Sequence, residues 1–330
     1  MSRLSTLIHG FAGAYLRQKA PLFLSYALTH RCNCRCGYCA LPKTPVSELS
    51  FEEVAGIIDQ FAKLGLSRIS LTGGEPLLYP DFDRVVAHLV ERRITVSCNT
   101  NGLLIPAKLD SLKKISAVAV SIDGPKTAHD SVRGRGNFDQ AIEGVSLLQK
   151  HGVPVTLLAV LSGHNIDEID GLVETAQKLG TPFAVQPVQP TLLGSYMENA
   201  DLPTVAQMQS AIRRLIEKKK AGAPVLNSVP CLQHFMTWPQ GHDIGCLAGR
   251  LTYRLEPDGM LTHCERMPNE SLPWIDLKTM PVKQAIERLP AAGCDRCYCA
   301  GQVELQLARN LKPAAMWGLL RRTGKPGGGR

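Results

Sequence analysis

The stretch Cys32-Asn33-Cys34-Arg35-Cys36-Gly37-Tyr38-Cys39 is the most informative part of this chain, because three of its cysteines have the spacing Cys-x3-Cys-x2-Cys. It comes directly after an apolar, strand-like run at residues 22–28. A four-iron cluster usually takes four cysteine thiolates, so a compact loop that supplies only Cys32, Cys36 and Cys39 leaves one iron open for a ligand that is not protein. The loop therefore predicts a 4Fe–4S cluster with an open coordination site. A zinc knuckle or a disulfide knot is the alternative interpretation.

Polar motifs follow the next three predicted strands, at the point where each strand ends. The motif TGGEP occupies residues 72–76, NTNG occupies 99–102 and SIDGP occupies 121–125. Because the carboxyl ends of parallel strands meet on one rim, we expect the three motifs to converge there. The two glycines of the first motif remove Cβ bulk, so that a ligand can approach the backbone. Glu75 and neighbouring carbonyl groups can accept hydrogen bonds from a cationic amine.

The SIDGP motif opens a longer run that continues with His129-Asp130, Arg133-Gly134 and Gly136-Asn137-Phe138. This run is similar, nearly residue for residue, to the branch of the radical S-adenosylmethionine (radical SAM) superfamily that carries C-terminal SPASM or twitch domains. The cysteine loop resembles the same superfamily. The resemblance implies that the open iron chelates the amino and carboxylate groups of SAM, and that SAM is cleaved reductively to a 5′-deoxyadenosyl radical.

The resemblance also implies which residues contact SAM. The stretch Gly73–Glu75 would hold the amino group, while Ser121 and Arg133 would contact the ribose and the carboxylate, which suits a planar guanidinium. Asn99 could also reach the ribose, although simple turn capping is the alternative for Asn99 and Asn101. The expected cofactor-binding residues are Gly73, Gly74, Glu75, Ser121, Arg133, Asn99 and Tyr38, and the expected ligands of the first cluster are Cys32, Cys36 and Cys39.

Alternating strand and helix patterns predict a parallel sheet over the first two thirds of the chain. Side chains typical of helix N-caps, each with an acid or amide three residues later, mark helix starts at Ser50, Asn137 and Asn165. A further helix is expected near residues 205–221. We expect a partial (β/α)6 TIM-like barrel, the fold that the superfamily uses. Its six strands are predicted at residues 22–28, 68–71, 95–98, 117–122, 153–160 and 183–186.

Cysteines become frequent again after residue 225. A hairpin is predicted from strands at 253–255 and 260–262 around the turn 256–259. Cysteines flanking this hairpin and a later Cys-x2-Cys resemble the twitch domain, which implies one auxiliary 4Fe–4S cluster in a small α+β domain. The expected ligands are Cys246, Cys264, Cys294 and Cys297. Cys299 is an alternative last ligand, and a four-thiolate zinc site is the alternative metal centre.

These patterns divide the chain into four predicted parts. An amphipathic helix is expected at 1–20, the barrel at 21–225, the auxiliary cluster domain at 226–312 and a basic tail at 313–330. The apolar stripe within residues 3–18 suits packing against the barrel, or else contact with a membrane surface. Cys34 inside the loop, Cys98 at a strand end and Cys231 are expected to be small buried residues.

Composition bounds the class of protein. The chain has 330 residues, eleven cysteines and a formal net charge of +8. Cysteines gathered in two clumps indicate metal ligation in a reducing compartment rather than disulfide stapling. With no membrane span or signal peptide in the sequence, the expected location is cytoplasmic. The basic residues are dispersed, and nothing clearly indicates a nucleic acid partner.

The expected activity is that of a radical SAM enzyme that receives an electron from an external one-electron donor such as flavodoxin or ferredoxin. A small-molecule or lipid-like biosynthetic substrate is favoured, because a single auxiliary cluster is expected and no separate peptide-recognition domain is visible. The amphipathic ends add possible peripheral membrane contact. Two alternatives are a maturase of a ribosomally synthesised peptide and a non-catalytic iron–sulfur electron-transfer protein.

Overall fold

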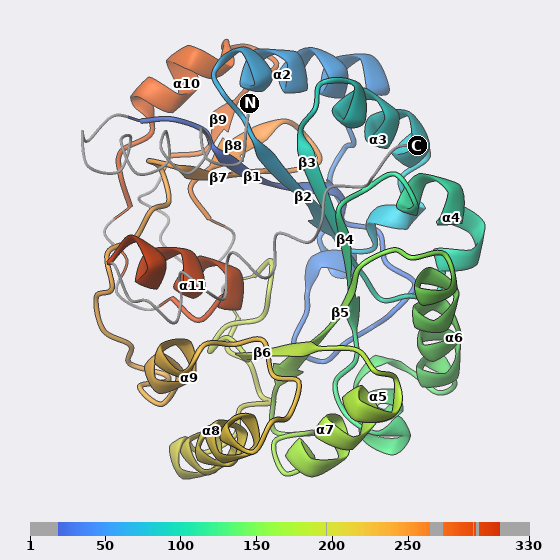
Figure 1. The fold of residues 1–330 in the computed structure, drawn as a ribbon. Coiled ribbons are helices and arrows are strands. Elements are labelled where there is room, and N and C mark those ends of the chain that lie inside the picture. Colours follow the sequence, from blue (N-terminus) through green and yellow to red (C-terminus); the bar gives the residue numbers. More distant parts are fainter. Residues whose placement is uncertain (1–18, 196, 265–272, 293, 295–296, 311–330) are drawn as a thin grey trace.

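The computed structural model describes residues 19–195, 197–264, 273–292, 294 and 297–310. Six parallel strands follow one another in chain order and form a curved, open sheet (Figure 1). They are β1 (Phe23–Thr29), β2 (Arg68–Gly73), β3 (Thr95–Thr100), β4 (Ala117–Ser121), β5 (Val155–Leu161) and β6 (Phe183–Pro187). The expected open, partial α/β barrel is confirmed, with strand ends within three residues of the prediction.

Helices cover the outer face of this curved sheet, and α11 lies on its open side (Figure 1). The backbone N–H of Ser228 donates to Glu304 Oε1 of α11 at 2.6 Å, which fixes α11 to the start of α9. The helices are η1 (Leu41–Lys43), α2 (Phe51–Lys63), η2 (Pro76–Leu78), α3 (Phe82–Glu91), α4 (Ile105–Leu112), α5 (Lys126–Arg133), α6 (Asn137–Lys150), α7 (Ile169–Lys178), α8 (Val205–Lys220), α9 (Val229–Phe235), α10 (Val282–Arg288) and α11 (Ala300–Arg309).

The start of α2 has the predicted capping box. The backbone N–H of Glu53 donates to Ser50 Oγ at 3.3 Å, and the backbone N–H of Ser50 donates to the Glu53 carboxylate at 2.7 Å. Two N–H groups that lack helical partners are satisfied in this way. The same arrangement at Thr204 and Gln207 begins α8, and it was not predicted.

The other two predicted caps are wrong. Helix α6 begins after Gly136, whose left-handed backbone makes the turn, and the Asn137 amide donates backward to the Arg133 carbonyl at 2.7 Å. Helix α7 begins at Ile169, three residues after the predicted start. The Asn165 side chain instead donates to the carbonyl of Asp123 at 2.7 Å, because the turn after β5 packs on the end of β4.

The predicted hairpin is confirmed, and it extends the barrel sheet. Strand β7 (Thr252–Leu255) pairs antiparallel with β8 (Met260–Thr262), and β8 pairs with β9 (Ile275–Asp276). Strand β7 also runs parallel to β1, which gives one sheet in the order β6-β5-β4-β3-β2-β1-β7-β8-β9. This attachment to β1 was not predicted, because a hairpin signal is local and does not specify its neighbours.

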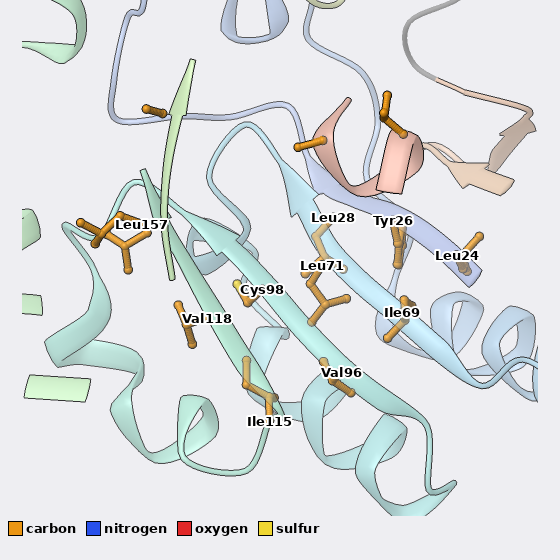
Figure 2. Packing of buried hydrophobic residues seen from close by; sticks show 14 of the residues in the cluster. Leu24, Tyr26, Leu28, Ile69, Leu71, Val96, Cys98, Ile115, Val118 and Leu157 are labelled. Carbon is orange, nitrogen blue, oxygen red and sulfur yellow. The ribbon is translucent and has the colours of Figure 1, made fainter. Parts of the chain in front are cut away.

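The core lies between the strands and their covering helices. Figure 2 shows Tyr26 and Leu28 of β1 beside Leu71 of β2, with Val96 and Cys98 of β3 next along the sheet. Each of these side chains is at most 1% exposed. Cys34, Cys98 and Cys231 are all buried, as expected. Buried apolar surface of this extent supplies the main stabilisation of a domain of this size.

Lys19 ties the beginning of the described chain to α10. Its ammonium donates to the carbonyls of Ile286 at 3.1 Å, Glu287 at 2.8 Å and Leu289, so it satisfies and neutralises the C-terminal end of that helix. The expected amphipathic helix at 1–20, apart from its last two residues, and the expected tail at 313–330 lie outside the described residues, and the expected domain boundaries stay predictions. Among the described helices, none combines the length and apolarity needed to cross a membrane.

Candidate active site

The inner face of the strand arc carries small and polar side chains. The sheet register pairs Ser25 of β1 with Ser70 of β2, and Ser70 with Ser97 of β3, and all three serines are partly exposed. The residues immediately before and after each serine point to the opposite face, into the core. Closed barrels fill this face with bulky branched side chains, so the small residues here leave it open toward a ligand. Asn99 and Ser121 lie on the same face, at the C-terminal ends of β3 and β4.

The cysteine loop leaves the C-terminal end of β1 at this rim. Cys32, Cys36 and Cys39 are each partly exposed. Burial, with smaller contributions from the charges of Cys36 and Cys32, raises the pKa of Cys39 to about 12, so the three thiols lie within electrostatic range of one another. A hydrogen bond from Cys34 lowers the pKa of Cys32 to about 6. The structure thus brings the three predicted ligands together.

This group of thiols fits an iron–sulfur cluster. Burial raises the pKa of Cys36 as well as that of Cys39, and a coordinated metal reverses such a shift because it deprotonates a bound thiol. Within the described ranges, no three His, Cys, Asp or Glu side chains converge on a point where one metal ion could sit. A four-iron cluster places each thiolate on a different iron, so its ligands do not need to converge on one point.

Gly73 and Gly74 pack against the backbone of the cysteine loop. The backbone N–H of Gly74 donates to the Thr29 carbonyl at 2.7 Å. A Cβ on Gly74 would overlap the Arg31 carbonyl oxygen and would stand 2.5 Å from the His30 carbonyl oxygen. The glycines were predicted to admit a ligand, and the closest approach that they permit in the structure is to the chain's own loop.

The Glu75 carboxylate points into the protein and not toward the rim. It is fully buried and accepts hydrogen bonds from Thr100 Oγ1 at 2.8 Å, Leu77 N at 3.1 Å and Asn101 N at 2.8 Å. Burial raises the pKa of Glu75 to about 7, against these hydrogen bonds, which favour its ionised form. Its side chain is therefore committed to protein partners, and what this stretch offers to a ligand is backbone.

Arg133 lies beside the cysteine loop but is already paired. Its Nε donates to Asp123 Oδ2 at 2.6 Å and its Nη2 donates to Tyr38 Oη at 2.7 Å. The second oxygen of Asp123 accepts from Val160 N at 2.9 Å, so the carboxylate braces both the arginine and β5. The structure brings Tyr38 and Arg133 together, with the Arg133 side chain 9% exposed. A ligand would meet a guanidinium whose Nε and Nη2 are held by protein.

The second group of cysteines is also brought together. Burial raises the pKa of Cys246 and the charge of Cys294 adds to that shift, so these two thiols are near neighbours. Burial likewise raises the pKa of Cys297, with further contributions from Cys299, Cys264 and Cys246. All four predicted ligands gather here, and Cys299 stands among them. His234 Nε2 donates to the Cys297 carbonyl at 2.7 Å and so orients this segment.

Comparison with known proteins identifies the family of this chain. The family model described as "Radical SAM superfamily" matches residues 26–176. A protein of Methanocella arvoryzae named "Probable GTP 3',8-cyclase" is 33% identical over 214 residues, which cover 62% of this chain and 67% of that protein. The chain belongs to the radical SAM superfamily.

Two further comparisons extend over more of the chain. The "PqqA peptide cyclase" of Ruegeria pomeroyi is 29% identical over 279 residues, covering 80% of this chain and 72% of that protein. The crystal structure of Streptococcus suis SuiB bound to S-adenosylmethionine superposes with a TM-score of 0.68 at 17% identity, covering 81% of this chain and 65% of that chain. At this identity the likeness to SuiB is one of fold.

Family membership settles the class and the cofactors. This radical SAM enzyme uses a 4Fe–4S cluster, as the cysteine spacing predicted, and SAM, as the family resemblance implied. The interpretations as a zinc knuckle, a disulfide knot or a non-catalytic electron-transfer protein are therefore set aside. The contacts of Asn101 and Thr100 were missed, because both residues lie where β3 ends and strand alternation no longer indicates where a side chain points.

Proposed function

We propose that this radical SAM enzyme modifies a ribosomally synthesised peptide, the alternative that the sequence alone did not favour. The likeness to the PqqA peptide cyclase supports this, because it covers 80% of the chain, a longer span than the predicted barrel at 21–225. A relative that is named for a peptide substrate thus shares more than the SAM-binding part. The lipid-like substrate depended on residues 3–18 and 313–330, outside the described residues, and no comparison supports membrane contact.

The residues proposed to bind the first cluster and SAM are those that meet at the rim. Cys32, Cys36 and Cys39 would hold the cluster, and the backbone of Gly73–Glu75 would accept hydrogen bonds from the amine of SAM. Asn99 and Ser121, partly exposed on the inner face, would contact its ribose. Arg133, pre-oriented by Asp123 and Tyr38, would present its remaining nitrogen to the carboxylate, and a rigid guanidinium loses little entropy on binding.

When bound and reduced by a donor of the flavodoxin or ferredoxin type, the cluster and SAM supply a 5′-deoxyadenosyl radical that abstracts hydrogen from the substrate. The chain's own part is to orient SAM and to exclude water from the inner face. The auxiliary cluster, on Cys246, Cys264, Cys294 and Cys297, would accept an electron or orient the peptide. A loaded enzyme would then carry roughly eight irons per chain, from two four-iron clusters. Zinc in place of half of this iron would refute the auxiliary assignment.

The small-molecule substrate is the second candidate function. The relative named GTP 3',8-cyclase has the higher identity of the two reported, 33%, although its match covers only 62% of this chain. The aligned length, 214 residues, is about that of the predicted barrel at 21–225. The comparison thus favours a small molecule only as far as the SAM-binding part is concerned.

Co-expression separates the two candidates. The enzyme is produced anaerobically with each short open reading frame that flanks its gene, and the peptides are measured by mass spectrometry. The peptide proposal expects one of them to lose hydrogen mass or gain a cross-link with the active enzyme and to stay unchanged with Cys36→Ala. Unchanged peptides throughout, together with enzyme-dependent consumption of a small molecule such as GTP, would establish the second candidate.

A further inference from the structure

Asn101 touches the cysteine loop from the end of β3. Its Nδ2 lies 3.9 Å from Cys32 Sγ, within hydrogen-bond range for sulfur, and 2.6 Å from the Asn33 Oδ1 that accepts from it. Its Oδ1 accepts from the backbone N–H of Leu103 at 3.1 Å, which fixes the orientation of the amide. Only 6% of Asn101 is exposed. The amide is therefore a buried donor aimed at the first cysteine of the loop.

The buried Glu75 explains why this amide holds its place. One oxygen of the carboxylate accepts from the backbone N–H of Asn101, and the other accepts from the hydroxyl of Thr100. That hydroxyl accepts in turn from Gly102 N at 3.0 Å. The carboxylate thus holds Thr100 and Asn101 directly and Gly102 through the Thr100 hydroxyl, and a carboxylate with several donors is a strong anchor. The chain of contacts runs from Glu75 through the turn to Cys32.

We propose that Asn101 is a positioning residue for the first cluster, whose amide donates to the Cys32 thiolate and raises the reduction potential of the cluster. The inference rests on Cys32 being a cluster ligand, as proposed above. An N–H group that points at a ligand sulfur favours the reduced cluster, because that form carries one more negative charge, and hydrogen bonds to sulfur are among the factors that set such potentials. Easier reduction serves an enzyme that must be reduced before each SAM cleavage.

A purely structural role is the competing explanation. The 2.6 Å contact with Asn33 could brace the loop without any effect on the cluster. The two explanations differ in what they change: a brace alters how much iron is bound, whereas a donor to Cys32 alters the potential of the iron that is bound.

The test measures the midpoint potential of the first cluster by anaerobic redox titration with EPR detection. Cys246→Ala and Cys297→Ala are included in every protein, so that the signal comes from the first cluster alone. Asn101→Leu removes the donor without adding charge. Asn101→Ser keeps an oxygen that can accept from Leu103 N, and so keeps the turn, but is too short to reach Cys32. Asn137→Leu is the matched control, because its amide donates at 3.4 Å to Cys34, which lies outside the proposed ligand set.

We expect Asn101→Leu and Asn101→Ser to lower the midpoint potential of the first cluster. At a fixed applied potential, the ratio of reduced to oxidised cluster should fall by about threefold to tenfold, where tenfold corresponds to 59 mV for one electron. Asn137→Leu should leave the potential unchanged. If the iron-loaded fraction of the Asn101→Ser protein has the same midpoint potential as the wild type, the proposal is overturned and Asn101 is only a structural brace. Retention of the EPR signal in Cys32→Ala would instead overturn the ligand assignment, so the two failures are distinguishable.

Discussion

At the scale of single residues, Glu75 decides how the β2 end of the site is built. Its folded-state pKa of about 7 lies above the ordinary glutamate pKa of 4.5 because the side chain is buried. The native protein therefore binds a proton more tightly than the unfolded chain between these values, and stability falls as the pH rises through this window. The contribution is on the order of 3 kcal/mol over the window.

Urea denaturation of the wild type and of Glu75→Gln at pH 5 and pH 8 tests this sign, with thiols kept reduced. The variant cannot ionise, and its misplaced amide hydrogens weaken the turn at both values of pH, so it should be the less stable protein at pH 5. We expect its deficit to shrink at pH 8. Parallel pH profiles for the two proteins would contradict the raised pKa.

A second residue-scale prediction concerns Gly74. Because a Cβ there would meet the carbonyls of Arg31 and His30, Gly74→Ala should displace the cysteine loop and cost at least about 1–3 kcal/mol, the usual penalty of overpacking. Gly37, inside the loop itself, has nothing within 4 Å of the Cβ position, and Gly37→Ala should be close to neutral. Thermal melts and iron content of the two variants, reconstituted side by side, provide the comparison. Equal iron and equal melting temperatures would refute the packing account.

Residue identity and residue orientation differ in how far sequence can predict them. The spacing of Cys32, Cys36 and Cys39 predicts a ligand set, and in the structure the three thiols lie within electrostatic range of one another. The direction of the Glu75 side chain was not predictable, because it depends on three donors that only the folded β2–β3 contact brings together. The same holds for Arg133, whose Nε pairs with Asp123 and whose Nη2 pairs with Tyr38, 95 residues earlier in the chain.

At the scale of secondary structure elements, local signals predicted the strands well and the helix starts less well. Strand alternation and the Ser50 box depend on neighbouring residues, and they were confirmed. Asn137 and Asn165 failed as caps because their side chains are engaged elsewhere: the Asn137 amide donates to the Arg133 carbonyl four residues earlier, and the Asn165 amide donates to the Asp123 carbonyl across the fold. The position of β7 beside β1 is likewise a long-range pairing that a hairpin signal does not contain.

The confirmed cap on α2 gives a prediction at this scale. Ser50→Ala removes the oxygen that accepts from Glu53 N, and it should destabilise the protein by about 1 kcal/mol. Ser47→Ala, at an exposed position before the helix, is the control and should change the unfolding free energy by less than about 0.5 kcal/mol. The measurement is equilibrium denaturation followed by circular dichroism. Equal losses in the two variants would mean that the box contributes nothing.

At the scale of the whole molecule, one continuous sheet connects the two groups of cysteines. The first group leaves β1, and β1 pairs with β7 of the hairpin that leads to Cys264. A side-chain contact reinforces this pairing, since His30 Nε2 lies 3.0 Å from Glu256 Oε2. The other oxygen of the Glu256 carboxylate accepts from Arg254 Nε at 2.8 Å in a buried ion pair. The auxiliary region is thereby held against the rim where SAM is proposed to bind.

Release of 5′-deoxyadenosine is the measurement that tests the central claim most directly. Anaerobically reconstituted enzyme, incubated with SAM and dithionite and no substrate, should release it slowly, because the proposed cleavage site is complete within this chain. The variant with Cys32, Cys36 and Cys39 all changed to Ala should release none while it keeps about half of the iron, the share of one of two clusters. Intact SAM after incubation with fully iron-loaded wild-type enzyme would contradict the account.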